Sequence, residues 1–337
     1  MGKMVLVWVL GVVVILAAGL PVWGAGQAKN EMELGRRRVE KAADVQAGVV
    51  FKRVGDIELV LDIFTPKGRD KSAPKMATVI FVHGGGWYMN TREEIYAHRF
   101  AAMVEKLMGE DLAVVSFDYR LVAVPNMHWK PNREKHLVAP DHTYEKIIAD
   151  CKDVVRWLHK NGAEYDLDAE RMATWGGSAG GHLSLMMGLT GPADFLGDPE
   201  LAKYRSDIKC LVSWYGTTDF VGQYESMKKR KGGPVPPLLG GTPEEKATDY
   251  KKASPVNYLR KDSVPILLLH GTVDPIVPYA QSVLLDDKAK DIGADVEFVT
   301  VNPAGHNFAP KGQMKPTLDE IHDLTVKFLV ENLGASN

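Results

Sequence analysis

From about Gly48 onward, the chain alternates between two hydrophobic patterns. In the first, apolar residues follow one another without interruption, as in residues 266–269, which is typical of strands covered by helices on both faces. In the second, apolar residues recur at every third or fourth position, as in residues 144–158, which is typical of helices with one buried face. The alternation predicts an α/β fold, with a mostly parallel central sheet of about eight strands and helices on both faces.

The expected elements follow in a regular order along the chain. The expected strands are residues 49–54, 57–64, 77–82, 112–117, 171–175, 208–214, 264–269 and 296–301. The expected helices are residues 91–108, 144–159, 179–189, 279–292 and 317–332. Gly55 and Asp56 separate the first two strands as the turn of an antiparallel hairpin. Residues 121–142 and 217–262 do not fit the alternation, and because each follows a strand end, we expect them to form walls of a substrate cleft.

The first 28 residues have the layout of a secretory signal peptide. Lys3 precedes an almost unbroken apolar run over residues 5–20, and small residues follow that run. The run is shorter than the roughly 20 residues that a membrane-spanning helix needs. We therefore expect cleavage and a secreted or periplasmic protein with no stable membrane association, and an uncleaved anchor is the alternative. Residues 29–47 are rich in charge and are expected to form a flexible lead-in to a single domain at residues 48–337.

Composition narrows the possible partners. Lys and Arg total 41 against 43 Asp and Glu, a net charge of −2, so no overall field attracts the protein to nucleic acid. Only two cysteines are present, which excludes a disulfide scaffold and a four-cysteine zinc site. Cys151 lies on the apolar stripe of an expected helix and Cys210 lies in an expected strand, so we expect two buried thiols, with a disulfide as the alternative. No residues have the spacing of metal ligands, so neither a metal nor a cofactor is expected.

A serine stands at a sharp turn between an expected strand and an expected helix. Residues 176–180 read Gly-Gly-Ser-Ala-Gly, between the strand at 171–175 and the helix at 179–189. Only small residues fit around such a turn, and the serine hydroxyl projects from the edge of the sheet. The spacing G-x-G-x-x-G is absent, which disfavours a dinucleotide site. The sequence therefore predicts Ser178 as a nucleophile.

Three consecutive glycines directly follow the expected strand at 77–82, between His83 and Trp87. A backbone without side chains can approach a substrate closely and turn its N–H groups toward a carbonyl oxygen. We expect an oxyanion hole formed by the N–H groups of Gly84, Gly85 and Ala179, the last of these being next to the predicted nucleophile.

An acid and a base are available downstream of the serine. A free hydroxyl is a poor nucleophile at neutral pH, so Ser178 needs a histidine as base, and that histidine needs an acid to orient it. Asp274 and His306 each follow a late expected strand, and the order serine, aspartate, histidine is that of α/β-hydrolases. Asp219, after another strand, is the rival acid. His182 lies within the helix after the serine and is expected to pack rather than react.

The chain resembles the α/β-hydrolase superfamily over about residues 50–333. The resemblance rests on residues 83–87, 118–121, 177–183, 253–256, 270–278 and 305–306. The most similar groups are carboxylesterases related to hormone-sensitive lipase and the BD-FAE group of secreted acetyl xylan and feruloyl esterases. Hormone-sensitive-lipase relatives usually carry aspartate before the serine, whereas this chain has Gly177, which favours the BD-FAE group. The resemblance implies the same oxyanion donors, and a short acid esterified to a carbohydrate such as xylan as the substrate class.

Four aromatic residues on loops at strand ends are candidates for binding that alcohol. An exposed ring offers a flat apolar face on which a sugar can lie. The candidates are Trp87, Tyr88, Trp129 and Tyr215.

The expected function is that of a secreted serine carboxylesterase, which hydrolyses acetyl or feruloyl esters through an acyl-enzyme. An amidase, a peptidase or a hydrolase similar to kynurenine formamidases would use the same triad and is the alternative. A non-catalytic binding protein on this fold is a further alternative. A lipase is disfavoured, because residues 121–142 carry charged side chains and lack a long apolar lid.

Overall fold

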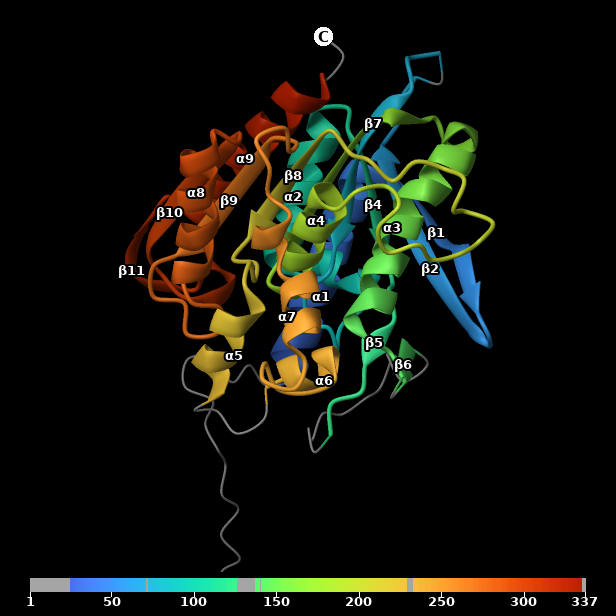
Figure 1. The fold of residues 1–337 in the computed structure, drawn as a ribbon. Helices are drawn as coiled ribbons and strands as arrows, with labels where there is room; N and C mark the ends of the chain where they lie inside the picture. Colours follow the sequence, from blue (N-terminus) through green and yellow to red (C-terminus); the bar gives the residue numbers. More distant parts are fainter. Residues whose placement is uncertain (1–24, 71, 126–136, 140, 229–232, 335–337) are drawn as a thin grey trace, which may run out of the picture.

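The computed structural model describes residues 25–70, 72–125, 137–139, 141–228 and 233–334 (Figure 1). Within these residues, nine strands form one sheet in the order β1-β2-β4-β3-β7-β8-β9-β10-β11. They are β1 (Ala43–Val54), β2 (Ile57–Pro66), β3 (Met76–Val82), β4 (Ala113–Phe117), β7 (Leu167–Gly177), β8 (Cys210–Trp214), β9 (Ile266–Gly271), β10 (Val296–Ala304) and β11 (Pro310–Lys315). The strands from β4 through β10 in that order pair in parallel, and β1, β2 and β11 are antiparallel to their neighbours.

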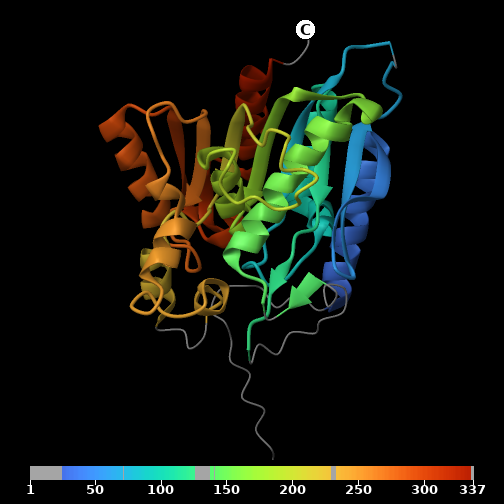
Figure 2. The ribbon, with the colours of Figure 1, turned by 45° about the vertical axis from the view of Figure 1, so that its right-hand side comes forward.

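Helices cover both faces of this sheet. The helices are α1 (Ala25–Ala42), α2 (His98–Gly109), α3 (Tyr144–Asn161), α4 (Ala179–Leu189), α5 (Phe220–Lys228), α6 (Val235–Leu239), α7 (Ala247–Ala253), α8 (Ala280–Ile292) and α9 (Leu318–Leu333). Short 3₁₀ turns are η1 (Arg92–Tyr96), η3 (Gly162–Tyr165), η4 (Pro255–Asn257) and η5 (His306–Phe308). Helices α1, α2 and α9 pack on one face, and α3, α4 and α8 pack on the other (Figures 1 and 2). The prediction of a mostly parallel α/β sheet between two helical layers is confirmed.

Burial on both faces explains the uninterrupted apolar runs. In β9, Ile266 and Leu268 belong to the core on the α3 side, and Leu267 and Leu269 belong to the core on the α2 side. The two cysteines divide in the same way between the two cores, and both are buried and free of a disulfide. The prediction of buried thiols is confirmed.

The two stretches that interrupt the alternation gather at one end of the sheet. The first contributes β5 (Leu121–Val122) and β6 (Val138–Ala139), which pair with each other, and the second contributes α5, α6 and α7. All of these elements lie at the lower end in Figures 1 and 2, opposite the C-terminus. This is the end at which β7 meets α4, as expected for walls beside a site on the carboxyl ends of the strands.

The predicted lead-in at 29–47 is wrong, because these residues form most of α1 and the start of β1. Helix α1 docks on η1: a Cβ at Gly35 would lie 1.8 Å from the Tyr96 carbonyl oxygen, and the Arg36 guanidinium lies 4.1 Å from the Tyr96 ring centroid. Val39 is fully buried. Arg36 and Arg38 of this segment form ion pairs with Glu93 and Glu105 across the contact, so the run of charge does not indicate a solvated chain. Of the expected signal peptide, residues 1–24 lie outside the described residues.

Other differences concern element ends and short elements. The expected helix at 91–108 is broken into η1 and α2 at Ala97, whose backbone is extended with φ −61° and ψ 140°. Strand β11 and helices α5 to α7 are too short for periodicity to identify. Among the described residues, no helix combines the length and the apolar character needed to cross a bilayer.

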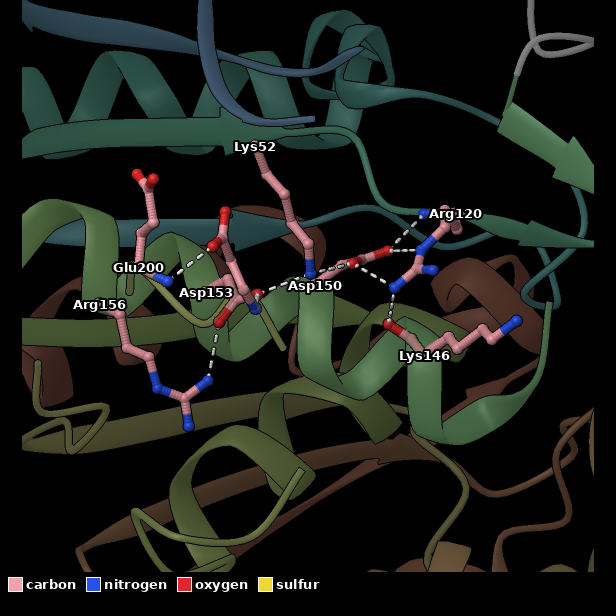
Figure 3. A network of polar contacts seen from close by, with 8 residues as sticks. Lys52, Arg120, Lys146, Asp150, Asp153, Arg156 and Glu200 are labelled. Atoms are coloured by element: carbon pink, nitrogen blue, oxygen red, sulfur yellow. Dashed lines mark hydrogen bonds and ion pairs between the residues drawn. The ribbon is translucent and has the colours of Figure 1, made fainter. Parts of the chain in front are cut away.

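A buried network of charges joins β1, the segment after β4, and α3 (Figure 3). Lys52 Nζ donates to Asp150 at 2.7 Å and to Asp153 at 2.6 Å, and both carboxylates are fully buried. Arg120 Nε donates to Asp150 at 2.7 Å, and Arg156 Nη1 donates to Asp153 at 2.8 Å. Because each buried charge has partners of opposite sign, the network fixes the position of α3 on the sheet.

Replacing Asp150 should strongly destabilise the fold. Asp150→Ala leaves Lys52 and Arg120 without one of their partners in a buried site, which typically costs about 3–5 kcal/mol. The measurement is the free energy of unfolding in urea. The control is Asp141→Ala, which removes a pair with Lys146 whose aspartate side chain is 73% exposed, and little change is expected there. Equal effects of the two changes would contradict this reading of the network.

Candidate active site

The serine elbow is a strained turn between β7 and α4. Ser178 has φ 57° and ψ −122°, a conformation that non-glycine residues rarely adopt. Its N–H donates to the Trp214 carbonyl at 2.9 Å, which ties the turn to β8. A Cβ at Gly180 would lie 2.0 Å from the Val82 carbonyl oxygen, and one at Gly176 would lie 2.6 Å from it. The glycines of the motif are therefore required by the close approach of β3 and α4.

Ser178, His306 and Asp274 lie in one chain of hydrogen bonds. His306 Nδ1 lies 2.7 Å from Asp274 Oδ2, and His306 Nε2 lies 3.1 Å from Ser178 Oγ. A carboxylate can only accept, so His306 carries its proton on Nδ1, and Nε2 is free to accept the serine proton. The structure thus brings together the three residues that the sequence singled out as nucleophile, base and acid.

Asp274 is held as an ionised acceptor. Its Oδ1 accepts from the N–H groups of Ile276 and Val277 at 2.7 and 3.0 Å. Burial would raise the pKa of Asp274, but hydrogen bonds from His270 and His306 outweigh burial and hold that pKa well below its usual value. Asp274 is therefore charged at neutral pH and can stabilise a positive charge on His306.

The rival acid lies elsewhere and has another role. Asp219 Oδ2 accepts from Gly222 N at 2.7 Å, and its Oδ1 accepts from Val221 N at 3.3 Å, at the start of α5. These bonds cap the helix, and His306 is paired with Asp274 instead.

His182 packs, as expected from the sequence. Trp87 Nε1 donates to its Nδ1 at 3.1 Å, and its Nε2 lies 2.9 Å from the Ala253 carbonyl. Burial lowers the pKa of His182 to about 4, so the ring is neutral and joins the glycine loop to α7.

One predicted oxyanion donor is corrected by the geometry. The N–H of Gly84 donates to Glu94 Oε2 at 2.6 Å, so it is already engaged with a carboxylate. The N–H groups of Gly85 and Gly86 have no acceptor within the described part of the chain. The N–H of Ala179 is at the first position of α4, where a helix offers no acceptor. The amides available to a bound oxygen are therefore those of Gly85, Gly86 and Ala179.

The carbonyl groups of the glycine loop are also held by hydrogen bonds. Tyr119 Oη donates to the His83 carbonyl at 2.9 Å, His83 Nδ1 lies 2.9 Å from the Gly84 carbonyl, and Met89 N donates to the Gly85 carbonyl at 3.1 Å. In a trans peptide the C=O and the following N–H point in opposite directions. Each of these bonds therefore also sets the direction of the next N–H in the loop.

The aromatic residues expected to bind a sugar are not a shared exposed surface. Trp87 is 4% exposed and packs on Phe220, and Tyr215 is 1% exposed with its ring edge-to-face against His306. Tyr88 is half-buried, and Trp129 lies outside the described residues. The prediction is wrong for Trp87 and Tyr215, because rings next to the elbow fill the space around the catalytic turn.

Three further residues shape the site without having been singled out. Glu94 holds Gly84, Tyr119 holds the carbonyl side of the glycine loop, and His270 lies 3.5 Å from Asp274 Oδ2. Tyr119 and His270 stand in motifs that carried the family resemblance, whereas Glu94 had no sequence signal. In the described ranges, no group of three His, Cys, Asp or Glu side chains could hold a metal ion.

The chain matches one family model over most of the sheet. The model described as BD-FAE matches residues 61–289. The chain belongs to the BD-FAE family. Esterase LipC of Mycobacterium tuberculosis is 25% identical over 260 residues, which cover 74% of this chain and 57% of LipC. Esterase LipQ of the same organism is 27% identical over 280 residues, covering 81% of this chain and 58% of LipQ. The chain thus spans little more than half the length of these curated relatives.

Solved structures share the fold. A truncated carbohydrate esterase from gut microbiota superposes with a TM-score of 0.68 at 23% identity, covering 87% of this chain and 97% of that one. Esterase 2 of Thermogutta terrifontis with bound butyrate gives 0.65 at 24% identity, covering 86% and 94%. Together with the strand order, these likenesses confirm the predicted α/β-hydrolase fold.

The choice of acid gives a direct test. Asp274→Asn should reduce kcat for p-nitrophenyl acetate by about 10⁴, as the corresponding change does in serine proteases. The reason is that an amide can donate to His306 Nδ1 and so favour the tautomer with its proton on Nε2, which cannot accept the serine proton. Asp219→Asn should reduce helix capping at α5 with little effect on kcat. If Asp219→Asn proved the costlier change for kcat, the acid would have to be reassigned.

Proposed function

We propose that this protein is a serine carboxylesterase. The observation that carries the proposal is the continuous chain from Asp274 through His306 to Ser178 Oγ, beside backbone N–H groups without an acceptor in the described residues. That combination supplies an activated nucleophile and a place for a developing negative charge. The curated relatives named as esterases support the same class of reaction.

The proposed reaction proceeds through an acyl-enzyme. Ser178 Oγ attacks the ester carbonyl carbon while its proton passes to His306 Nε2, and the amides of Gly85, Gly86 and Ala179 bind the resulting oxyanion. Collapse breaks the bond to the alcohol oxygen, which takes the proton from His306. A water molecule then attacks the acyl-enzyme with His306 as base, which releases the acid and restores Ser178.

The proposed substrates are short acyl esters on a polar alcohol, with acetyl or feruloyl esters of a carbohydrate such as xylan as the main candidates. The family match, a structural neighbour named as a carbohydrate esterase and another with bound butyrate support this class. Pro234 and the ring of Tyr88 lie beside Gly86. The described surface next to the proposed oxyanion amides is therefore partly apolar. Trp87 and Tyr215 are buried, and Tyr88 is the partly exposed ring among the described candidates for a sugar contact.

Export is part of the proposal. Residues 1–28 carry the signal-peptide pattern, and the contacts of α1 with the core and with η1 include those of Met32 and Gly35, which follow that segment. Cleavage at either expected point, after Gly24 or after Ala28, would therefore leave the docked face of α1 intact. Amino-terminal sequencing of the protein from a culture supernatant or periplasm identifies the cleavage point, and recovery with Met1 in place would favour the anchor.

Ser178→Ala should abolish turnover without unfolding the protein. The triad acts as a unit, so removing the nucleophile should reduce kcat/KM for p-nitrophenyl acetate by several orders of magnitude. Circular dichroism and the melting temperature check folding. A fluorophosphonate probe should label Ser178 in the wild type and leave the variant unlabelled. Labelling of another serine, or activity that survives the change, would refute the assignment.

Acyl length and leaving group test the substrate class. We expect kcat/KM for p-nitrophenyl acetate or butyrate to exceed that for the decanoate, with a shallow dependence, since one methylene is worth about 1–3 kcal/mol. Acetate or ferulate should be released from decorated xylan. Activity that increased through the decanoate, with no release from polysaccharide, would point to a lipase. Faster hydrolysis of N-formylkynurenine than of any ester would point to the amide hydrolase.

A further inference from the structure

Glu94 occupies a place beside the nucleophile that the reaction scheme does not use. It lies in η1, its side chain is 13% exposed, and its Oε2 accepts the Gly84 N–H at 2.6 Å. The Cβ direction at Gly84 points to a spot 3.4 Å from Glu94 Oε2 and 3.7 Å from Ser178 Cβ. A carboxylate thus lies just behind the loop that carries the oxyanion donors.

The element that presents Glu94 is itself anchored. Arg92, two residues earlier, donates from its backbone N–H to Asp118 Oδ1 at 2.8 Å and from Nη1 to Oδ2 at 2.6 Å. Its Nε lies 2.9 Å from Asp62 Oδ1 on β2. Asp118 is 1% exposed, so this is a buried, charge-assisted attachment of η1 to the strand ends. The attachment of η1 therefore fixes the position from which Glu94 bonds to Gly84.

The glycine loop needs hydrogen bonds from other groups to fix its backbone. Three consecutive glycines have more accessible backbone conformations than any other sequence, so their peptide planes are not fixed by local preference. Bonds to the carbonyl side reach the loop from Tyr119 and His83, and the bond to Glu94 is the one described hold on the N–H of Gly84. Together they fix the two peptide planes that flank Gly84 and, through them, the N–H of Gly85.

A bare carboxylate here would oppose catalysis, because it would repel a developing oxyanion. Arg99 removes that difficulty: its Nη2 donates to Glu94 Oε1 at 3.1 Å. The guanidinium compensates the negative charge while the second oxygen keeps its bond to Gly84.

We propose that Glu94, neutralised by Arg99, is a positioning residue that fixes the oxyanion loop through Gly84. This rests on the proposed esterase reaction. Glu94 makes no contact with substrate in this scheme; it acts by setting the direction of backbone donors. Its loss should therefore weaken binding of the oxyanion more than binding of the ester.

The experiment compares Glu94→Ala and Glu94→Gln with Glu93→Gln as a matched control. Glu93 is the neighbouring carboxylate on the same turn, and it pairs with Arg36 of α1. For each protein we would measure kcat and KM for p-nitrophenyl acetate, the Ki of a trifluoromethyl ketone, and the melting temperature. The ketone adds Ser178 Oγ to its carbonyl and places a negative oxygen at the donors, so its Ki reports the oxyanion site.

Glu94→Ala should lower kcat by about 10- to 100-fold with KM little changed, and raise Ki by a similar factor. Glu94→Gln keeps an acceptor for Gly84 but loses the charge, so a smaller parallel change of about 3- to 10-fold is expected. Glu93→Gln should match the wild type. If Glu94→Ala does not fold, the near-isosteric Glu94→Gln decides the matter. If both variants fold, wild-type kcat and Ki in both would overturn the proposal. If Glu94→Ala does not fold, wild-type kcat and Ki in Glu94→Gln would overturn it.

A separate readout distinguishes this proposal from the proposed function. Phosphonylation of Ser178 by a fluorophosphonate needs the nucleophile and the oxyanion donors but no particular ester. If the wild type reacts with the probe yet hydrolyses no ester, the esterase proposal fails, and the labelling rates of the Glu94 variants still decide the positioning role. Unchanged labelling rates in those variants would refute it.

Discussion

Three consecutive buried polar side chains after β4 hold the structure around the site. Asp118 pairs with Arg92, Tyr119 donates to the His83 carbonyl, and Arg120 pairs with Asp150. A buried polar group without a partner costs free energy, so each of these side chains must be satisfied in one arrangement of its neighbours. One short segment thereby fixes η1, the glycine loop and α3 relative to the sheet.

The serine turn depends on the sheet in a different way. The unusual backbone of Ser178 typically costs about 1–3 kcal/mol, and such a conformation persists only where its surroundings determine it. Here the surroundings are main-chain groups: the Trp214 carbonyl accepts from Ser178, and the Val82 carbonyl leaves no room for a Cβ at Gly180. The parallel order β3-β7-β8 is therefore a condition for the elbow, since it supplies both carbonyls.

Sequence patterns predicted the parts of this protein that depend on periodicity and chain order. Helix α4 begins and ends where expected, and Ser178, Asp274 and His306 lie together as their order indicated. Patterns failed where a partner distant in sequence decides. The charges of α1 suggested a solvent-exposed segment, but two of them form ion pairs with η1 and α2. The aromatic character of Trp87 suggested a ligand-binding surface, but its ring is buried and donates a hydrogen bond to His182. No pattern reveals whether one backbone N–H, such as that of Gly84, is already bonded.

These failures share one physical cause, which is geometry set by contacts between segments that are distant in sequence. The same distinction divides the site into two halves. The nucleophile, base and acid follow β7, β10 and β9, whose main-chain ladders fix them, so a motif in the sequence is enough to locate them. The oxyanion loop follows β3 and consists of glycines, so its geometry depends on the adjacent side chain of His83 and on Tyr119 and Glu94 from other segments. The first half is encoded locally and the second half is encoded by tertiary contacts. Substitutions of the side chains that hold this loop, such as Glu94, should therefore alter the rate of the chemical step while leaving the triad itself in place.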